Sequence, residues 1–183
     1  HGTIRPVEDM VIVFVASACM ILSWVFMGWE YRIIHEVWIY RDSLYEDFSL
    51  TGKGRDTLGM VGNCAMHDVM IISKQDLRNG FLNNNGTYNT AIHEFVHLID
   101  KADGSTDGLP EYLLQHQYAI PWLERMHMEM ELIKTSNSDI NPYGATNETE
   151  FLAVAAEYFF KNPHLMKERH PELFTMLQQI FRP

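Results

Sequence analysis

His93 and His97 stand four residues apart, and Glu94 directly follows the first of them, in the sequence H-E-F-V-H. Residues i and i+4 of an α-helix share one face, so both imidazoles reach a single metal ion if the segment is helical. The glutamate between them can then act on a water molecule beside that ion. The pattern predicts a zinc site of the hydrolytic kind, with His93 and His97 as ligands and Glu94 as general base. The alternative is a helix that carries two histidines and a solvated glutamate without metal.

A third ligand is needed, because a catalytic zinc usually has three protein ligands and a water. Glu150 and Glu157 lie in a stretch, 149–160, that is otherwise apolar on nearly every side. Their spacing of seven places them almost in line on one helical face, and buried carboxylates need a compensating charge. We expect Glu150 to bind the metal and Glu157 to accept the N–H of a ligand histidine. The alternatives are a capping box for Glu150, three residues after Asn147, and a simple ion pair for Glu157.

Asp100 and Asp103 offer a different third ligand. They follow His97 at the spacing of the metzincin pattern H-E-x-x-H-x-x-G-x-x-H, in which Asp103 would complete the site. Asp100, however, occupies the position where that pattern needs a glycine for a sharp turn, and this disfavours the arrangement. One turn beyond His97, Asp100 is instead expected to orient a ligand histidine, and the alternative is that it caps and solvates the helix end.

The elements that must position these residues are mostly helices. A helix is predicted from about residue 90 to residue 101, and Gly104 is placed to end it. A second begins after Asn147, a good N-cap residue, and runs from 148 to about 161. The other expected elements are helices over 110–134, with Pro121 as a break or a fresh start, and 171–181, strands over 36–40 and 69–73, and loops over 79–89 and 136–147. The fold class is therefore α+β, mostly helical with a small sheet.

An uncharged, apolar run of 20 residues covers positions 10–29, about the length that spans a bilayer. Small residues interrupt the run, and only Arg5 and Arg32 flank it. Glu8 and Asp9 stand where a soluble helix carries its N-terminal acids. We therefore expect a buried core helix over about 8–29 rather than a membrane span, and no signal peptide. The sequence starts at His1, so the question of an upstream targeting or membrane segment stays open.

Composition narrows the class of protein. The 183 residues, of which 46% are apolar, suit one domain over 1–183 with its own core. Fourteen Lys and Arg against twenty-four Asp and Glu give a net charge of −10, which argues against nucleic acid as a partner. Two cysteines, Cys19 and Cys64, exclude a disulfide framework and a thiolate metal site.

Several stretches, most of them in the second half of the chain, together resemble a known family. They are His93–Asp100 (HEFVHLID), Asp107-Gly-Leu-Pro110, Tyr143 and the run from Glu150 to Phe160, with a weaker match over 15–22 and at Ile39-Tyr40. This set resembles the Mlc titration factor A family of zinc peptidases, a gluzincin group similar to the catalytic domain of anthrax lethal factor. The resemblance implies a zincin-like metallopeptidase domain that is mostly helical with a small sheet.

The resemblance also implies roles for residues. It assigns His93, His97 and Glu150 to one Zn²⁺ per chain and Glu94 to the base, in agreement with the spacing argument. It adds Tyr143 as a hydrogen-bond donor to the oxyanion, against the alternative of a loop aromatic packed on the core. It further implies a cytoplasmic protein that cuts short peptides in an aminopeptidase-like way, and a family that sequesters a transcriptional repressor. A partner-capturing module with weak or no peptidase activity is therefore the competing interpretation.

Overall fold

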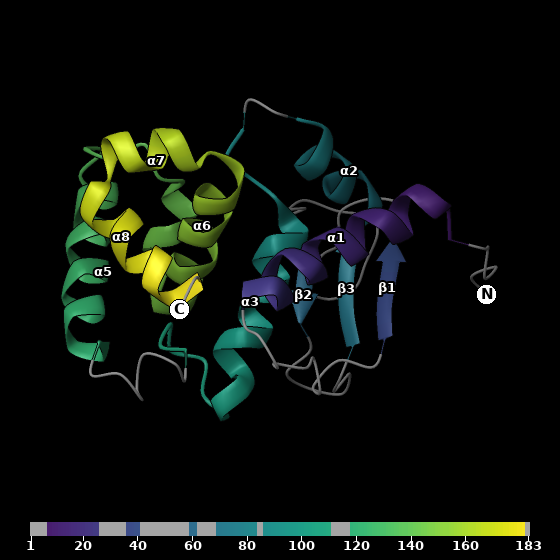
Figure 1. Ribbon diagram of the computed structural model, residues 1–183, viewed down its shortest axis with the longest axis horizontal. Helices are drawn as coiled ribbons and strands as arrows, with labels where there is room; N and C mark the ends of the chain where they lie inside the picture. Colours follow the sequence, from purple (N-terminus) through teal and green to yellow (C-terminus); the bar gives the residue numbers. More distant parts are fainter. Residues whose placement is uncertain are drawn as a thin grey trace, which may run out of the picture.

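The computed structural model describes residues 7–25, 36–40, 59–61, 69–83, 86–110 and 118–181. In chain order the elements are α1 (Asp9–Val25), β1 (Glu36–Tyr40), β2 (Gly59–Val61), β3 (Val69–Ser73), α2 (Lys74–Leu82), α3 (Thr90–Asp100), η1 (Lys101–Asp103), α5 (Ala119–Lys134), η2 (Pro142–Ala145), α6 (Glu148–Lys161), α7 (Pro163–Arg169) and α8 (Pro171–Phe181). Figure 1 shows α3 between a helical half, α5 to α8, and a half that holds the sheet, α1 and α2. The predicted α+β, mostly helical class is confirmed.

The sheet has three described strands in the order β1-β3-β2. Central β3 runs parallel to β1, with Trp38 beside Ile71, and antiparallel to β2, with Met60 beside Ile71. Three of the five residues in its V-M-I-I-S sequence are β-branched and the last four are buried, as suits a strand flanked on both sides. The bounds predicted for β1 and β3 are confirmed. Strand β2 was not predicted, because three residues are too few to show an alternating pattern.

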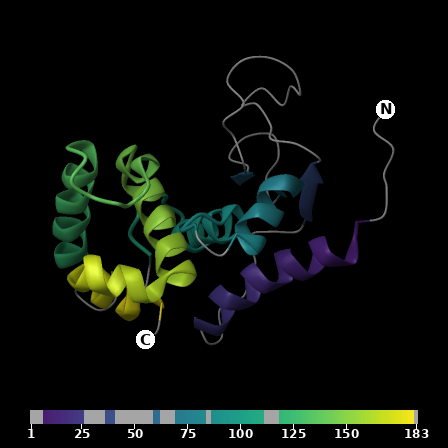
Figure 2. The same cartoon turned by 90° about the horizontal axis from the view of Figure 1, so that it is seen from above.

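Helix α1 packs against α2 and α3 and lies along one side of the domain (Figure 2). Val11 and Ala18 are fully buried, and the ring of Phe14 stacks on Phe81 of α2 with centroids 4.9 Å apart. Ile12 and Val13 are more than half exposed, so the helix is buried on one face only. The apolar run of the sequence had predicted a helix buried all round. Among the described residues no helix is long and apolar enough to cross a membrane. Beyond Val25 the predicted helix lies outside the described residues.

Helix α2 corrects the prediction of a loop over 79–89. The helix continues through Asn79 and Gly80 to Leu82, and the Ser73 side chain caps it by accepting the N–H of Asp76. Its apolar residues Leu77 and Phe81 are one turn apart and face the rest of the domain. Gly80 permits a close approach, because a Cβ atom there would lie 3.0 Å from the Cα of Asn89. Gly80, which has the composition of a loop residue, is thus a contact position within a helix.

The helical half is held by apolar contacts and by one polar cluster around His170. The imidazole Nδ1 lies 3.2 Å from Glu129 Oε2 on α5, and Nε2 lies 2.7 Å from Asp139 Oδ1. Asp139 also accepts hydrogen bonds from the Tyr158 hydroxyl and from Arg169, at 2.8 and 2.6 Å. The hydrogen bond to Glu129 raises the pKa of His170 against partial burial, and Asp139 raises it further. His170 therefore ties α5 and the loop before η2 to the junction of α7 and α8.

Two further differences from prediction lie in this half. Helix α5 starts at Ala119, and Pro121 sits within its first turn, where proline is tolerated. The earlier part of the helix predicted from residue 110 falls on residues 111–117, outside the described residues. Helix α7 and the short helix η2 were not predicted, whereas α6 and α8 have the predicted bounds.

Candidate metal centre

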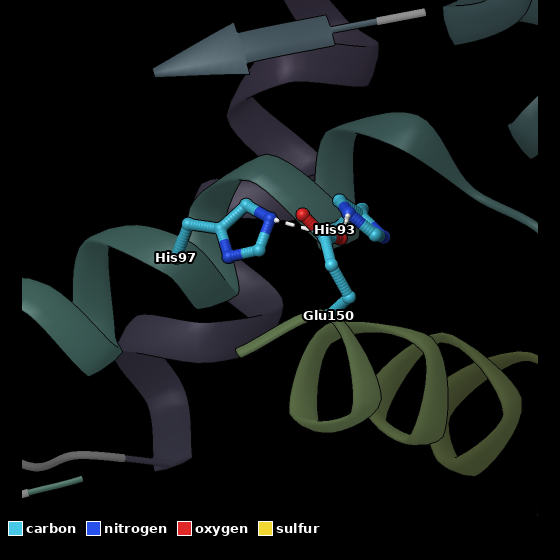
Figure 3. Close-up of side chains that lie close together, drawn as sticks. All are labelled: His93, His97 and Glu150. Atoms are coloured by element: carbon cyan, nitrogen blue, oxygen red, sulfur yellow. Dashed lines mark hydrogen bonds and ion pairs between the residues drawn. The ribbon is translucent and has the colours of Figure 1, made fainter. Parts of the chain in front are cut away.

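Three side chains from two helices converge on one point. His93 and His97 project from α3, and Glu150 projects from the first turn of α6, which packs against α3 (Figure 3). Glu150 Oε2 lies 2.9 Å from Nε2 of His93 and 3.6 Å from Nε2 of His97. The two imidazole rings are nearly perpendicular, with centroids 4.7 Å apart. The H-E-x-x-H helix and the acidic helix thus present their polar faces to each other.

Asparagine residues fix the start of both helices. The Asn89 side chain accepts the N–H of Ile92 at 3.2 Å, and the Asn147 side chain accepts the N–H of Glu150 at 2.9 Å. Each bond satisfies a backbone donor that a helix N-terminus otherwise leaves unpaired. In a full capping box the Glu150 carboxylate would also accept the N–H of Asn147. Here that carboxylate contacts His93 instead, so only the asparagine half of the box is formed.

The donor set suits a divalent metal ion. One ligand atom from each of His93, His97 and Glu150 lies within 4.8 Å of the other two. Two imidazoles and a carboxylate are ligands that catalytic zinc takes, leaving a fourth position for water. Among the described residues these three form the metal-competent group. The structure therefore brings the three predicted ligands together.

Charge at this point favours a cation. Burial opposes protonation of His93, but hydrogen bonds to Glu150 and Glu157 outweigh it and raise the pKa of His93 to about 10. Burial likewise disfavours the Glu150 carboxylate, yet the two histidines lower its pKa to about 2. A proton on His93 and a metal ion beside it satisfy the same two carboxylates, and a ligand imidazole must be unprotonated on the atom that binds. Metal and proton thus compete for this site.

Glu157 contacts the opposite side of the His93 ring. Its side chain is 3% exposed, and Oε1 lies 2.7 Å from Nδ1 of His93. Oε2 accepts the backbone N–H of Asn89, the residue that caps α3. These contacts direct Nε2 of His93 toward Glu150 and leave it to bind a metal. The placement is the one expected for Glu157 from its spacing.

Glu94 is buried within α3, 5% exposed, and burial raises the pKa of its carboxyl group against the attraction of His93 and His97. Tyr143 belongs to η2, is 53% exposed, and its ring centroid lies 6.0 Å from that of His93. The structure thus places Tyr143 at the rim of the site rather than in the core.

Asp100 differs from the sequence expectation, whereas Asp103 agrees with it. Asp103 is exposed and accepts hydrogen bonds from the backbone and hydroxyl of Ser105, so it lies away from the metal-competent group. Asp100 is fully buried, and its Oδ2 accepts the N–H of Gly108 at 3.1 Å. Its Oδ1 and Nδ1 of His97 are both without a hydrogen-bond partner, so the expected bond from Asp100 to a ligand histidine is not formed. Burial raises the pKa of Asp100 to about 6.

The segment after η1 connects Asp100 to the start of α6 through Gly108. Trp122 donates its indole N–H to the Gly108 carbonyl at 2.8 Å. Gly108 has φ +73°, and a Cβ atom on it would lie 2.5 Å from the carbonyl oxygen of Glu148. Both the left-handed backbone and the close contact require glycine. Gly108 therefore lets this segment touch the turn of α6 that carries Glu150.

A pocket of about 560 Å³ opens beside Glu150, and sequence reasoning did not find it. Its lining comes from three separate segments and consists of Thr106, Asp107, Leu109, Leu123, His127, Asn147, Glu148, Thr149 and Glu150. The sequence signal nearest to it was the run Asp107-Gly-Leu-Pro110, which entered only through the family resemblance. A pocket that adjoins a metal-competent group is where a substrate would be held.

An H-E-x-x-H helix packed on a second helix that supplies a glutamate defines a metallopeptidase-like domain. The sequence profile of the family described as Glucose-regulated metallo-peptidase M90 matches residues 3–182. The chain belongs to this family.

The chain is also similar to individual proteins. Mlc titration factor A of Edwardsiella ictaluri is 27% identical over 164 residues, which cover 81% of this chain and 60% of the relative. Mlc titration factor A of Pectobacterium atrosepticum is 25% identical over 162 residues, 81% of this chain and 59% of the relative. An uncharacterized protein of Synechocystis sp. is 32% identical over 98 residues, 51% of this chain and 36% of the relative. The chain spans about 60% of the length of the two titration factors.

Proposed function

We propose that the chain forms one zinc peptidase domain in which His93, His97 and Glu150 hold the metal. The observation that carries the proposal is the meeting of these three side chains, all within 4.8 Å, around one point on the H-E-x-x-H helix. Zinc is favoured over other divalent ions because two imidazoles and one carboxylate in a three-ligand set match its catalytic sites. Membership of a metallopeptidase family supports the same chemistry.

When bound, zinc lowers the pKa of a water molecule to about 7 and polarises the carbonyl of the peptide bond. Glu94 takes the proton of the attacking water and then gives it to the leaving amine, as a general base and then a general acid. Burial supports this role, because it raises the pKa of the Glu94 carboxyl group toward the range where a proton can be both accepted and released. Tyr143, at the rim, donates its hydroxyl hydrogen to the oxyanion that forms on the carbonyl.

The substrate class that follows from the resemblance is short peptides, cut in an aminopeptidase-like way. The cytoplasmic location implied by the same resemblance stays a prediction.

A second candidate function is capture of a protein partner. The relatives are named Mlc titration factor A, and the name describes titration of Mlc. For this chain the corresponding proposal is binding of a transcriptional repressor, with peptidase activity weak or absent. Such a module would hold its partner equally well when Glu94 is changed to glutamine.

The deciding experiment measures zinc per chain by elemental mass spectrometry after dialysis against metal-free buffer, and then cleavage of a library of short peptides. About one zinc per chain together with zinc-dependent cleavage supports the peptidase. A chain that retains no zinc, even after zinc is offered, contradicts it and leaves the partner-capturing module as the better account.

A further inference from the structure

We propose that the pocket beside Glu150 binds a positively charged nitrogen group of the substrate, chiefly the side chain of a lysine or arginine next to the bond that is cut. The inference rests on the proposed peptidase function, because it assigns a role to a pocket that adjoins the metal site. It goes further by naming the chemistry that this pocket selects.

The pocket adjoins the metal-competent group through one shared residue. Glu150 belongs both to the metal-competent group and to the lining of the pocket. A peptide whose carbonyl lies at the metal therefore has the neighbouring residue within reach of this cavity. Its volume of about 560 Å³ is ample for the longest side chains.

Charge in the pocket is negative. Asp107 faces it from the segment after η1, and Glu148 faces it from the first turn of α6. His127 is the single described lining residue able to carry positive charge, and its Nε2 lies 3.0 Å from Oε1 of Glu148. No lysine or arginine is among the described lining residues.

The N-terminus of α6 has the opposite effect. A helix N-terminus carries the equivalent of about half a positive charge and therefore attracts anions. Two full carboxylate charges, on Asp107 and Glu148, outweigh that partial charge. The Asn147 side chain also already accepts the N–H of Glu150, one of the donors that an anion would use. The balance of the pocket thus favours a cation.

Leu109 and Leu123 add apolar surface to the lining of the pocket. Lysine and arginine bury their methylene stems on such a surface while the charged end reaches a carboxylate or water. An N-terminal amine has the same positive charge without the stem. The positive charge bound in the pocket can therefore come from a lysine or arginine side chain or from the N-terminal amine, and the experiment distinguishes these two sources.

The experiment compares matched peptides in which the residue beside each candidate bond is lysine, arginine, norleucine or acetyl-lysine. Each peptide is made with a free and with an acetylated N-terminus. The value kcat/KM of the zinc-loaded wild type is expected to be highest for lysine and arginine. Asp107→Asn and Glu148→Gln are each expected to lower the ratio of lysine to norleucine cleavage about two- to fivefold, the size of a partly exposed charge pair. Glu131→Gln removes the same charge from an exposed position on α5 outside the pocket, and should keep the wild-type ratio.

A binding measurement separates this inference from the peptidase proposal. Zinc-loaded Glu94→Gln should bind the lysine peptide more tightly than the norleucine peptide, and adding Asp107→Asn should reduce the difference. If no peptide is cleaved by the wild type, the peptidase proposal fails, and the binding result still decides the role of the pocket.

Equal binding and equal cleavage of the lysine, norleucine and acetyl-lysine peptides would overturn the inference, provided that acetylation of the N-terminus also has no effect. So would a lysine preference that survives both pocket variants, or one that Glu131→Gln lowers as much as they do. If acetylation of the N-terminus abolishes the effect and the side chain does not matter, the pocket binds a cation whose source is the N-terminal amine.

Discussion

Oε1 of Glu157 lies 2.7 Å from Nδ1 of His93, although 64 residues separate the two in sequence. The contact joins the middle of α6 to the first half of α3 and sets the rotation of the imidazole. Because the same carboxylate also accepts the N–H of Asn89, Glu157 links the orientation of His93 to the start of α3.

Glu157→Gln should therefore weaken zinc binding about 10- to 100-fold, the usual effect of losing such a supporting partner. One oxygen of Glu157 contacts His93 and the other accepts from Asn89, and glutamine replaces one of these two acceptors with an NH2 donor. Competition with a fluorescent zinc chelator measures the affinity, and Glu168→Gln on exposed α7 is the charge-matched control. Unchanged affinity would mean that Glu157 is only an ion-pair partner.

Glu150→Ala should leave less than one zinc per chain after dialysis, because two histidines alone hold zinc poorly. Asp103→Ala should retain the wild-type content, since Asp103 is exposed and bonded to Ser105. Elemental mass spectrometry of both proteins gives the answer. The reverse result would restore the metzincin arrangement that the structure disfavours.

Glu94→Gln should keep zinc and lower kcat by at least about 100-fold, the contribution of a general base. Zinc content and peptide hydrolysis are measured on the same preparation, so that loss of metal is not mistaken for loss of chemistry. Full turnover by this variant would refute the assigned role of Glu94.

Gly108→Ala should destabilise the domain more than Gly104→Ala. Both residues have positive φ, so both substitutions strain the backbone, but nothing lies within 4 Å of a Cβ atom at Gly104. At Gly108 the new methyl group meets the backbone of Glu148, and the overlap should cost about 1–3 kcal/mol more in the free energy of unfolding. Urea denaturation of the two variants tests this. Zinc affinity should also fall in Gly108→Ala, because the displaced turn carries Glu150.

The His170 cluster predicts a pH-dependent contribution to stability. Folding raises the pKa of His170, so its contribution is complete below the unfolded value of about 6.5 and is lost as pH rises through the raised folded value. His170→Gln should therefore lower the free energy of unfolding by about 1–3 kcal/mol at acidic pH and by less at alkaline pH. Because both proteins keep the same metal site, its own titration cancels in the difference. His164→Gln, at an exposed position on α7, should show no such trend across the same urea titrations.

The ligand-bearing helices could be predicted because each carries its own local signals. Asn89 and Asn147 mark their starts, and the apolar spacing marks their lengths. The approach of Glu150 to the histidines was predicted by a different argument, the cost of burying a carboxylate without a partner. Both the helix signals and the burial cost are recognised from the sequence of the helix concerned alone.

What could not be predicted depends on contacts between distant segments. Asp100 carries the spacing of a residue that supports a ligand histidine, yet its carboxylate accepts from Gly108, which approaches only in the folded chain. Gly80 has the composition of a loop residue, yet it lies within α2 and packs against Asn89 at the start of α3. The pocket likewise could not be predicted, because its lining and its negative charge come from three segments that meet only in the folded chain.

His93 is the fourth residue of α3 and Glu150 the third of α6, so each lies in the opening turn of its helix. Helix ends open and close far more often than helix centres, with a free-energy cost well below that of global unfolding. A metal bound across the two ends would be released whenever either end frays, and would in turn slow that fraying. Backbone amide hydrogen exchange at residues 92–94 and 150–152 should therefore become slower on zinc addition, whereas the amides in the centre of α5 should exchange at the same rate with and without the metal.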